Sequence, residues 1–438
     1  MIFSQTTFIF FVAAILLVFS FIPQHWRLRW LILASLIWYA SWEWSWSLVL
    51  LSILAFNYLA LRFIPARRYD LLIALNALIF ILLKSGGVGR FSFDSPYGSS
   101  FYLFIIVAVV FDRWRAQTDG PISWEKFFLL PSFFPLLVGG PIERSAHFWD
   151  QLNDLKFRYH QLVDGLLIFS WGFLKLHILS APLVLINKAF YYEIYNRPYY
   201  LLLFGFTGTL QAYIDFSSYT EMGRGVARLF GVKLAVQFRP FYFARNPNDY
   251  WQRWNITLGT WIRDYVSFPL MLRFGRQYGQ HLIILFSFLL VGLWHGLSWN
   301  WLFFGLFNGL MIISFNWVHK KTALRGVGLF FAFLVIVGNG ILQRDFGLME
   351  FRAFAPEIIE LEWLKFREAS GVIFYGMLFT LLVMELIQEK KRLLDWYLQW
   401  PLLFKSLLAL ALMLLFLWAL DADLLTEKVI PLPSYFKI

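Results

Sequence analysis

The sequence predicts an all-α polytopic membrane protein, and three observations support this fold class. Of its 438 residues, 59% are hydrophobic and 21% are aromatic, whereas only 15% are charged. The mean hydropathy of +0.61 is far above that of soluble proteins. Apolar runs that are long enough to cross a hydrocarbon core, or nearly so, recur along the chain.

About eleven membrane spans are predicted, because a simple span takes about 20 residues. The apolar runs cover residues 8–22, 31–39, 48–61, 71–83, 101–111, 166–185, 201–214, 282–294, 301–318, 327–342, 372–387 and 402–420. Several runs are too short to cross a bilayer alone, which favours tilted, broken or re-entrant helices that line a cavity. No internal repeat or soluble domain is visible, so residues 1–438 are expected to form a single membrane domain.

The first apolar run is interpreted as a retained span and not as a cleavable signal. No basic residue precedes it, and no small-residue cleavage site follows Pro23. The chain contains no cysteine, which excludes disulfides, thiolate nucleophiles and thiolate metal ligands. We expect no metal site, and any covalent chemistry must use another side chain.

Basic residues predict the orientation in the membrane. They follow the first, third and fifth spans, as Arg27 and Arg29, then Arg62, Arg67 and Arg68, then Arg113 and Arg115. Since Lys and Arg in short loops stay cytoplasmic, the N-terminus is predicted to be extracytoplasmic. This bias and contact with anionic headgroups of the phospholipid bilayer explain the net charge of +11. Nucleic-acid binding is not expected, because the basic residues form no single face.

The most informative polar residue is His295, in the sequence Gly292-Leu293-Trp294-His295-Gly296. It lies in a run from residue 282 to 310 that is otherwise almost entirely apolar. A titratable imidazole at bilayer depth is costly and indicates a pathway or a reaction site. The alternative is a helix-packing histidine that is hydrogen-bonded to a neighbouring carbonyl.

Most other intramembrane polar residues lie in one block from Asp215 to Asp264. The block mixes carboxylates, guanidinium groups and aromatic rings too densely for a lipid-facing helix. Its pattern is also not periodic enough for a simple solvated helix face. The functional interpretation is that the block walls a polar cavity that reaches His295. The alternative is an interfacial connector whose Arg-Asp pairs only hold its shape.

The segment Leu130-Pro131-Ser132-Phe133-Phe134-Pro135 cannot form an uninterrupted helix. Each proline removes an amide donor and clashes with the preceding turn. Together with Gly139-Gly140-Pro141, the segment indicates a broken or re-entrant element, or a simple kinked span.

Four segments together resemble the membrane-bound O-acyltransferase family, most closely its bacterial branch of alginate O-acetylases and teichoic-acid D-alanyltransferases. They are residues 134–144, 215–222 and 250–264, and residues 292–296 with 301–309 behind them, in the family's order. The resemblance implies a ring of tilted helices around a thin central membrane region with a tunnel through it. It also implies that His295 is the catalytic histidine. An imidazole can accept the proton of an acceptor hydroxyl as that hydroxyl attacks an acyl carbonyl.

Two positions depart from the bacterial branch. Its Trp-Arg-Arg-Trp-His pattern usually supplies a second histidine where this chain has Asn255, and a further histidine is common where this chain has Asn308. Asn255 is expected to polarise the carbonyl, as a donor to the developing oxyanion, or to orient the acceptor. Further substrate-binding candidates, for donor contact and cavity walls, are Arg253, Trp251, Trp254, Asp264, Asp215, Glu221 and Asn308.

The C-terminal residues 431–438 resemble the aromatic tail of the same branch. Tyr435 could relay an acyl group as a transient ester of its hydroxyl. The alternative is an ordinary interfacial anchor.

The sequence and the resemblance together predict an acyltransferase of a bacterial inner membrane. It would move an acyl group, with acetyl expected, from a cytoplasmic donor toward an extracytoplasmic polysaccharide or envelope glycopolymer. No tightly bound cofactor is expected, and the donor would be acetyl-CoA or an acyl carrier protein thioester. A separate extracytoplasmic acyltransferase is an expected partner.

Two alternative functions stay open. One is a lipid-acceptor acyltransferase of the same family. The other is a transporter or channel with an intramembrane polar pathway, although the two related halves typical of a transporter are not visible.

Overall fold

The computed structural model is all-helical in its described part, except for one short antiparallel hairpin between Gly87–Val88 (β1) and Phe91–Ser92 (β2). This confirms the all-α fold class. The structure describes residues 3, 6–85, 87–88, 91–92, 96–117, 121–137, 139–194, 197–322, 325–343, 379, 383, 400–408 and 410–411.

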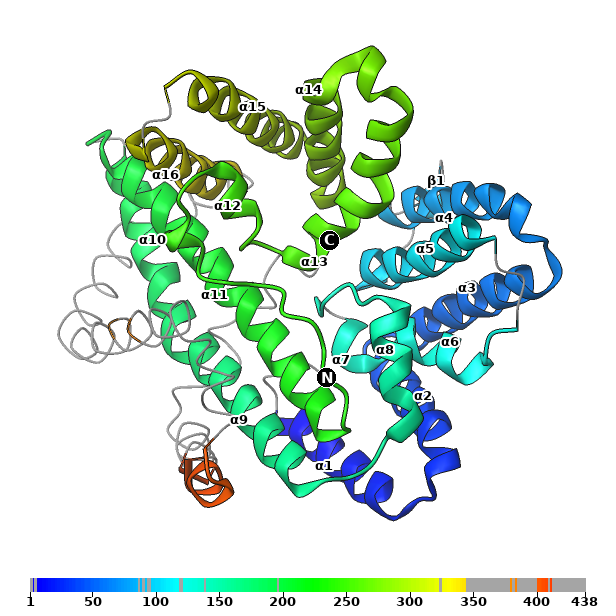
Figure 1. The fold of residues 1–438 in the computed structure, drawn as a ribbon. Helices are drawn as coiled ribbons and strands as arrows, with labels where there is room; N and C mark the ends of the chain where they lie inside the picture. The colour runs from blue at the N-terminus through cyan, green and yellow to red at the C-terminus, as the bar shows by residue number, and fades with distance from the viewer. Residues whose placement is uncertain are drawn as a thin grey trace.

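The helices of the N-terminal half lie together on one side of the molecule, in blue to cyan in Figure 1. They are α1 (Thr6–Phe21), α2 (Gln24–Ala40), α3 (Trp44–Phe63), α4 (Tyr69–Lys84), α5 (Ser99–Ala116), α6 (Trp124–Ser132), α7 (Phe134–Leu137) and α8 (Ser145–Gln151). An aromatic core joins them, because the ring centroid of Trp38 in α2 lies 6.3 Å from that of Phe8 and 6.0 Å from that of Phe134.

The C-terminal half is built around two long helical bodies that lie side by side, α9 with its extension α10 and α11 (Figure 1). Its helices are α9 (Tyr159–Lys175), α10 (Ala181–Glu193), α11 (Tyr200–Leu229), α12 (Pro247–Trp251), α13 (Ile256–Ile262), α14 (Phe268–His295), α15 (Trp299–Thr322) and α16 (Arg325–Leu342). A π-helical turn at Leu176–Ser180 joins α9 to α10.

Two glycines set the close approach of α9 and α11. A Cβ on Gly165 would lie 2.7 Å from the carbonyl oxygen of Gly225, and a Cβ on Gly225 would lie 2.7 Å from that of Gly165. Small residues at a helix contact are typical of packing inside a membrane, where close van der Waals contact drives association.

Apolar helices place the chain in a membrane. In the described part, the helices that are long and apolar enough to cross one are Trp44–Phe63, Tyr159–Tyr191 and Trp299–Lys320. Shorter apolar helices are Thr7–Phe21, Gly279–His295 and Gly326–Leu342. The arrangement of about eleven spans as a ring around a tunnel therefore stays a prediction.

Two breaks shape the elements around the candidate site. The proline-rich segment is broken as predicted, since α6 ends at Ser132 and α7 begins at Phe134. The second break is at Gly279, whose φ of 72° divides α14 into two arms. The hydroxyl of Ser267, just before α14, is hydrogen-bonded to that of Ser287 on the second arm, 2.8 Å away.

The beginning of the polar block differs from the sequence-based expectation. The helix that contains the apolar run 201–214 does not end where the polar residues begin. Instead, α11 continues without interruption to Leu229. Asp215 and Glu221 are therefore inside one 30-residue helix. The helix packs against α9, α10 and α16, so its polar residues face other helices and leave no simple amphipathic period in the sequence.

Candidate active site

Aromatic rings hold the imidazole of His295 at the end of the second arm of α14. The ring stacks on Trp301, with centroids 4.3 Å apart and planes 12° apart. Phe304 meets it edge-on at 5.6 Å, and the neighbouring Trp294 lies at 4.4 Å. The Nδ1 atom is buried and has no hydrogen-bond partner among the described residues. A buried polar atom of this kind calls for a substrate group or an ordered water.

The glycines on either side of His295 allow the helix ends to meet. A Cβ on Gly292 would lie 2.2 Å from the carbonyl oxygen of Trp301, and a Cβ on Gly296 would lie 2.6 Å from its Cδ1 atom. The missing side chains therefore bring α15 against α14 and set Trp301 over the imidazole.

One basic side chain from the N-terminal half contacts the backbone of His295. Lys84, the last residue of α4, donates a hydrogen bond from Nζ to the backbone oxygen of His295, at 3.1 Å. The sequence analysis did not select Lys84. The feature of the sequence that could have indicated Lys84 was its position as a single basic residue directly after the apolar run 71–83.

Asn255 immediately precedes α13 and has a left-handed conformation, with φ of 41°. Asparagine adopts this conformation more readily than most residues. Its Oδ1 atom accepts a hydrogen bond from Gln237 Nε2 at 2.9 Å. Thr220 of α11 in turn donates to Gln237 Oε1 at 3.1 Å. Gln237, which is fully buried and was not predicted as a site residue, thus orients the Asn255 side chain. In the described part of the chain, the amide nitrogen of Asn255 has no acceptor.

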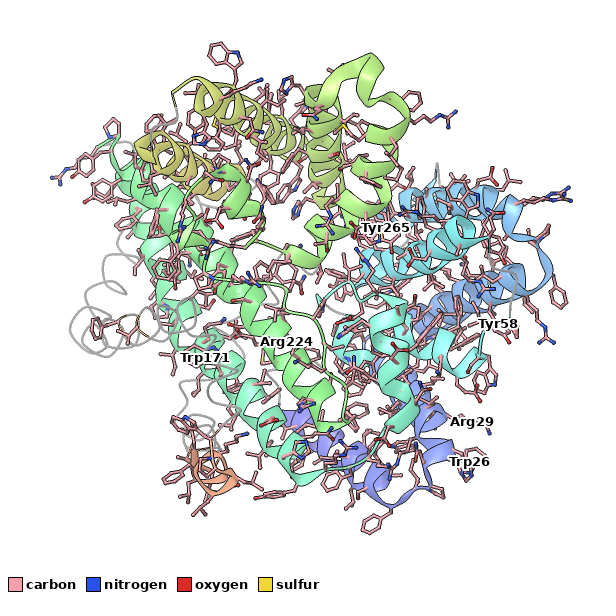
Figure 2. The ribbon with its side chains drawn as sticks, viewed as in Figure 1. Trp26, Arg29, Tyr58, Trp171, Arg224 and Tyr265 are labelled. Atoms are coloured by element: carbon pink, nitrogen blue, oxygen red, sulfur yellow. The ribbon has the colours of Figure 1, made fainter. Side chains whose placement is uncertain are left out.

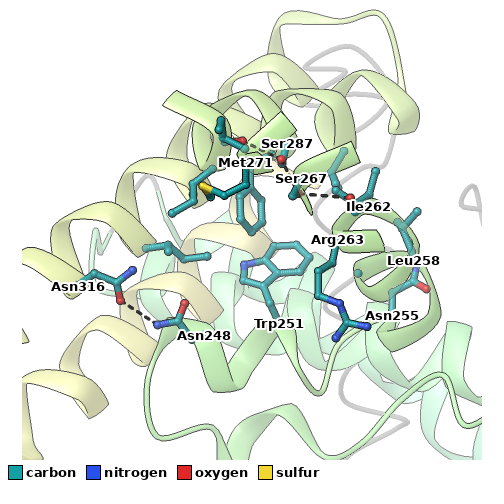
Figure 3. A pocket seen from close by; sticks show the side chains of 16 residues that line it. Asn248, Trp251, Asn255, Leu258, Ile262, Arg263, Ser267, Met271, Ser287 and Asn316 are labelled. Carbon is teal, nitrogen blue, oxygen red and sulfur yellow. Dashed lines mark hydrogen bonds between the residues drawn. The ribbon is translucent and has the colours of Figure 1, made fainter. Parts of the chain in front are cut away.

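A cavity of about 350 Å³ lies between α12, α13, α15 and the two arms of α14 (Figure 3). Most of its wall is apolar. The polar groups in the wall belong to Asn248, Asn255, Arg263, Ser267, Ser287, Asn316 and the indole of Trp251. The indole nitrogen of Trp251 is buried and has no partner among the described residues. An apolar cavity with a few polar groups is typical of a small-molecule site.

The ring of Phe304 contacts both a residue of the cavity wall and His295. Its ring centroid lies 6.1 Å from that of Trp251 in the cavity wall and 5.6 Å from the imidazole. Val291 also lines the cavity, one helical turn before His295. The structure thus places Asn255 in the cavity wall, whereas His295 is not among the residues that line the cavity.

The chain matches one family over half of its length. The sequence profile described as MBOAT, the membrane-bound O-acyltransferase family, matches residues 104–332. The chain belongs to this family. The match includes α6 to α15 in full, so both His295 and the cavity lie within it.

Relatives of this acyltransferase are named for modifying envelope polymers. The chain is 26% identical to the probable alginate O-acetylase AlgI of Pseudomonas fluorescens, over 78% of this chain and 72% of that protein. It is 27% identical to the peptidoglycan O-acetyltransferase of Helicobacter pylori, over 65% and 63%. It is also 27% identical to the teichoic acid D-alanyltransferase of Bacillus subtilis, over 46% and 53%. Together with the family match, these relatives support acyltransferase activity.

Two of the predicted site residues lie in the packed core beside the acyltransferase cavity. Arg253 is buried and donates from Nε to Asp249 Oδ1 at 2.8 Å and from Nη1 to Pro240 O at 3.2 Å. The indole of Trp254 stacks on Tyr250, with centroids 5.7 Å apart and planes 13° apart. Both side chains hold the loop that carries Asn255.

The predicted carboxylates tie neighbouring helices together. Asp215 accepts a hydrogen bond from Ser180 Oγ at 2.5 Å. Glu221 forms an ion pair with the buried Lys175 of α9 at 2.8 Å, one turn from Arg224, which is labelled on α11 in Figure 2. These contacts lie within the bundle formed by α9, α10 and α11.

Asp264 belongs to a half-exposed charged cluster where α13 meets α5. It pairs with Arg263 at 2.7 Å and with Arg144 at 3.5 Å. The Arg144 guanidinium lies over the ring of Tyr265, 4.8 Å from its centroid, and Figure 2 shows Tyr265 at this junction. The Tyr265 hydroxyl donates to Asp112 at the end of α5.

Asn308 faces α16 and not the cavity. Its Nδ2 atom donates to Asn339 Oδ1 at 2.7 Å and to Phe304 O at 2.9 Å. Among the described residues, no group of three or more His, Asp or Glu side chains could hold a metal ion. Tyr435 lies outside the described residues.

Proposed function

We propose that this acyltransferase moves an acetyl group from a cytoplasmic thioester toward a hydroxyl group of an extracytoplasmic envelope glycopolymer, with His295 as the general base. The observation that carries the proposal is the imidazole itself. Trp301 and Phe304 fix its plane, and its buried Nδ1 atom has no partner among the described residues. A base must be both oriented and free to accept a proton.

In the proposed reaction, the imidazole takes the proton of the acceptor hydroxyl while the hydroxyl oxygen attacks the thioester carbonyl. The carbon–sulfur bond of the tetrahedral intermediate then breaks, and the imidazolium returns the proton to the leaving thiolate. Burial among aromatic rings keeps water from competing with the acceptor.

The cavity is proposed as the donor site. Its apolar wall suits a pantetheine arm and a short acyl chain, and the Asn255 amide nitrogen offers a donor to a carbonyl there. Both acetyl-CoA and an acyl carrier protein thioester carry such an arm. The acyl end must pass Phe304 to reach His295, so Phe304 acts as a partition that the donor displaces.

The predicted orientation gives the reaction a direction. With the N-terminus extracytoplasmic, α4 runs outward, and Lys84 at its end lies toward the extracytoplasmic side. Because Lys84 contacts His295, the imidazole lies on the acceptor side of the cavity. In an inner membrane, a separate extracytoplasmic acyltransferase could then receive the acyl group and complete polymer modification.

The test is acyl transfer from radiolabelled acetyl-CoA in purified, reconstituted protein. His295→Ala should lower transfer at least about a hundredfold while the protein inserts and purifies normally. His281→Ala is the matched control, because His281 is exposed on the same arm of α14. Transfer at the wild-type rate by His295→Ala would refute the general base. Movement of label across the bilayer without any esterified product would instead favour a channel.

A further inference from the structure

Lys84 is a cation held against the candidate base by a contact between distant parts of the chain. Its Nζ atom lies 3.1 Å from the backbone oxygen of His295, 211 positions away in the sequence. The side chain is half-buried at the junction of α4 with the end of α14. The contact fixes the ammonium group within a few ångströms of the residue that carries the imidazole.

The charge of Lys84 has no counter-ion in the described part of the chain. No carboxylate pairs with it there, and the carbonyl of His295 uses only one of its three N–H bonds. An ammonium group that is partly removed from water without a counter-ion is costly. Within a membrane protein such a group marks a functional site by default.

A role for Lys84 in capping the C-terminal end of α14 does not explain why its side chain is charged. The last turn is already closed by a hydrogen bond from Gly296 N to Gly292 O at 3.2 Å. A neutral amide side chain could donate to the His295 carbonyl without the cost of burying a charge. The positive charge therefore calls for a negative group that is not among the described residues, and a substrate bound beside His295 would supply one.

We propose that Lys84 is a second catalytic residue of the His295 site and that its ammonium group binds the oxygen that becomes negative during acyl transfer. This inference rests on the proposed function. When the acceptor oxygen bonds to the acyl carbon and its proton moves to the imidazole, the carbonyl electron pair moves to oxygen. The free N–H bonds of Lys84 donate to that oxygen until the carbon–sulfur bond breaks. Stabilisation of developing charge by a positioned donor is often the largest contribution to catalysis.

The test uses acetyl-CoA as the donor and compares two variants of Lys84. Lys84→Met keeps the length of the side chain but removes the charge, and it should lower kcat by about a hundredfold while the Kd for acetyl-CoA stays unchanged. Lys84→Arg keeps the charge and should restore most of the turnover. Lys320→Met, at an exposed lysine in the last turn of α15, is the matched control and should behave as wild type.

Further measurements separate chemistry from folding. Methylammonium added to Lys84→Ala should restore part of the turnover, which a purely structural role would not allow. Should Lys84→Met fail to fold, Lys84→Gln keeps a hydrogen-bond donor and should show the same loss of kcat. The inference is wrong if a folded neutral variant of Lys84 turns over at the wild-type rate. It is also wrong if the activity lost by that variant is fully explained by a lower yield of folded protein. If a neutral Lys84 variant is fully active and His295→Ala is inactive, only the inference about Lys84 is wrong. If His295→Ala is also active, the proposed function is wrong as well.

Discussion

The imidazole of His295 lies flat against the indole of Trp301, with centroids 4.3 Å apart and planes only 12° apart. Gly292 and Gly296 make this contact possible, because any side chain at either position would collide with Trp301. The orientation of the candidate base is therefore set by the packing of α15 against α14.

Replacing Trp301 should impair catalysis more than binding. Trp301→Leu removes the surface that fixes the imidazole, so kcat should fall on the order of a hundredfold with little change in the Kd for acetyl-CoA. Trp301→Phe keeps a ring for stacking and should retain much of the activity. Trp299→Leu, at a side chain that is 74% exposed two residues away, is the control. Equal losses for the two leucine variants would contradict the stacking role.

A larger residue at Gly296 should act through stability. Because its Cβ would meet the Trp301 ring, Gly296→Ala should lower the free energy of unfolding by about 1–3 kcal/mol. Thermal unfolding in detergent measures this change. Gly326→Ala, where a Cβ would meet no described atom within 4 Å, should leave stability nearly unchanged. Unchanged stability but abolished transfer in Gly296→Ala would instead indicate a blocked substrate path.

Variants of Asn255 should separate its backbone from its side chain. Asn255→Ala loses the amide donor and strains a left-handed residue, so it should be unstable and about a hundredfold slower. Asn255→Gly relieves the strain and should recover folded yield but not transfer. Asn255→His tolerates the conformation and restores the pattern of the bacterial branch, so it should keep activity. Full activity of Asn255→Gly would show that the side chain is only structural.

Removing the partition at Phe304 should change the preferred acyl chain. Phe304→Ala joins the cavity to the space around His295, so a longer acyl chain can be buried there. At about 0.8 kcal/mol per buried CH₂, butyryl-CoA should gain about tenfold in kcat/KM relative to acetyl-CoA. Competition between the two thioesters measures this ratio. A ratio equal to that of wild type would place the acyl path elsewhere.

The two ends of α4 test the orientation on which the direction of transfer depends. The chain has no cysteine, so single cysteines can be introduced at two exposed positions, Asp70 and Ser85. An impermeant thiol reagent should label Ser85→Cys in intact spheroplasts, and it should label Asp70→Cys only after lysis. The reverse labelling would place Lys84 and His295 toward the cytoplasm.

Properties that depend on local chemistry could be read from the sequence alone. The apolar composition determined an all-helical membrane protein, because a backbone in lipid must satisfy its hydrogen bonds internally. Pro131 and Pro135 determined a helix break, which the structure has at Phe133. The isolation of His295 in an apolar run made it the leading candidate for the site.

Only the tertiary structure decided which residues meet His295 and Asn255. Lys84 reaches His295 from the other half of the chain, and Gln237 orients Asn255 from an irregular segment. Asn308, selected by its position in the sequence, turns toward Asn339 on α16. In a membrane protein both the lipid-facing side and the packed side of a helix are apolar, so sequence periodicity does not reveal which side meets which neighbour. Those contacts depend on the close fit of whole helices, and this fit exists only in the folded chain.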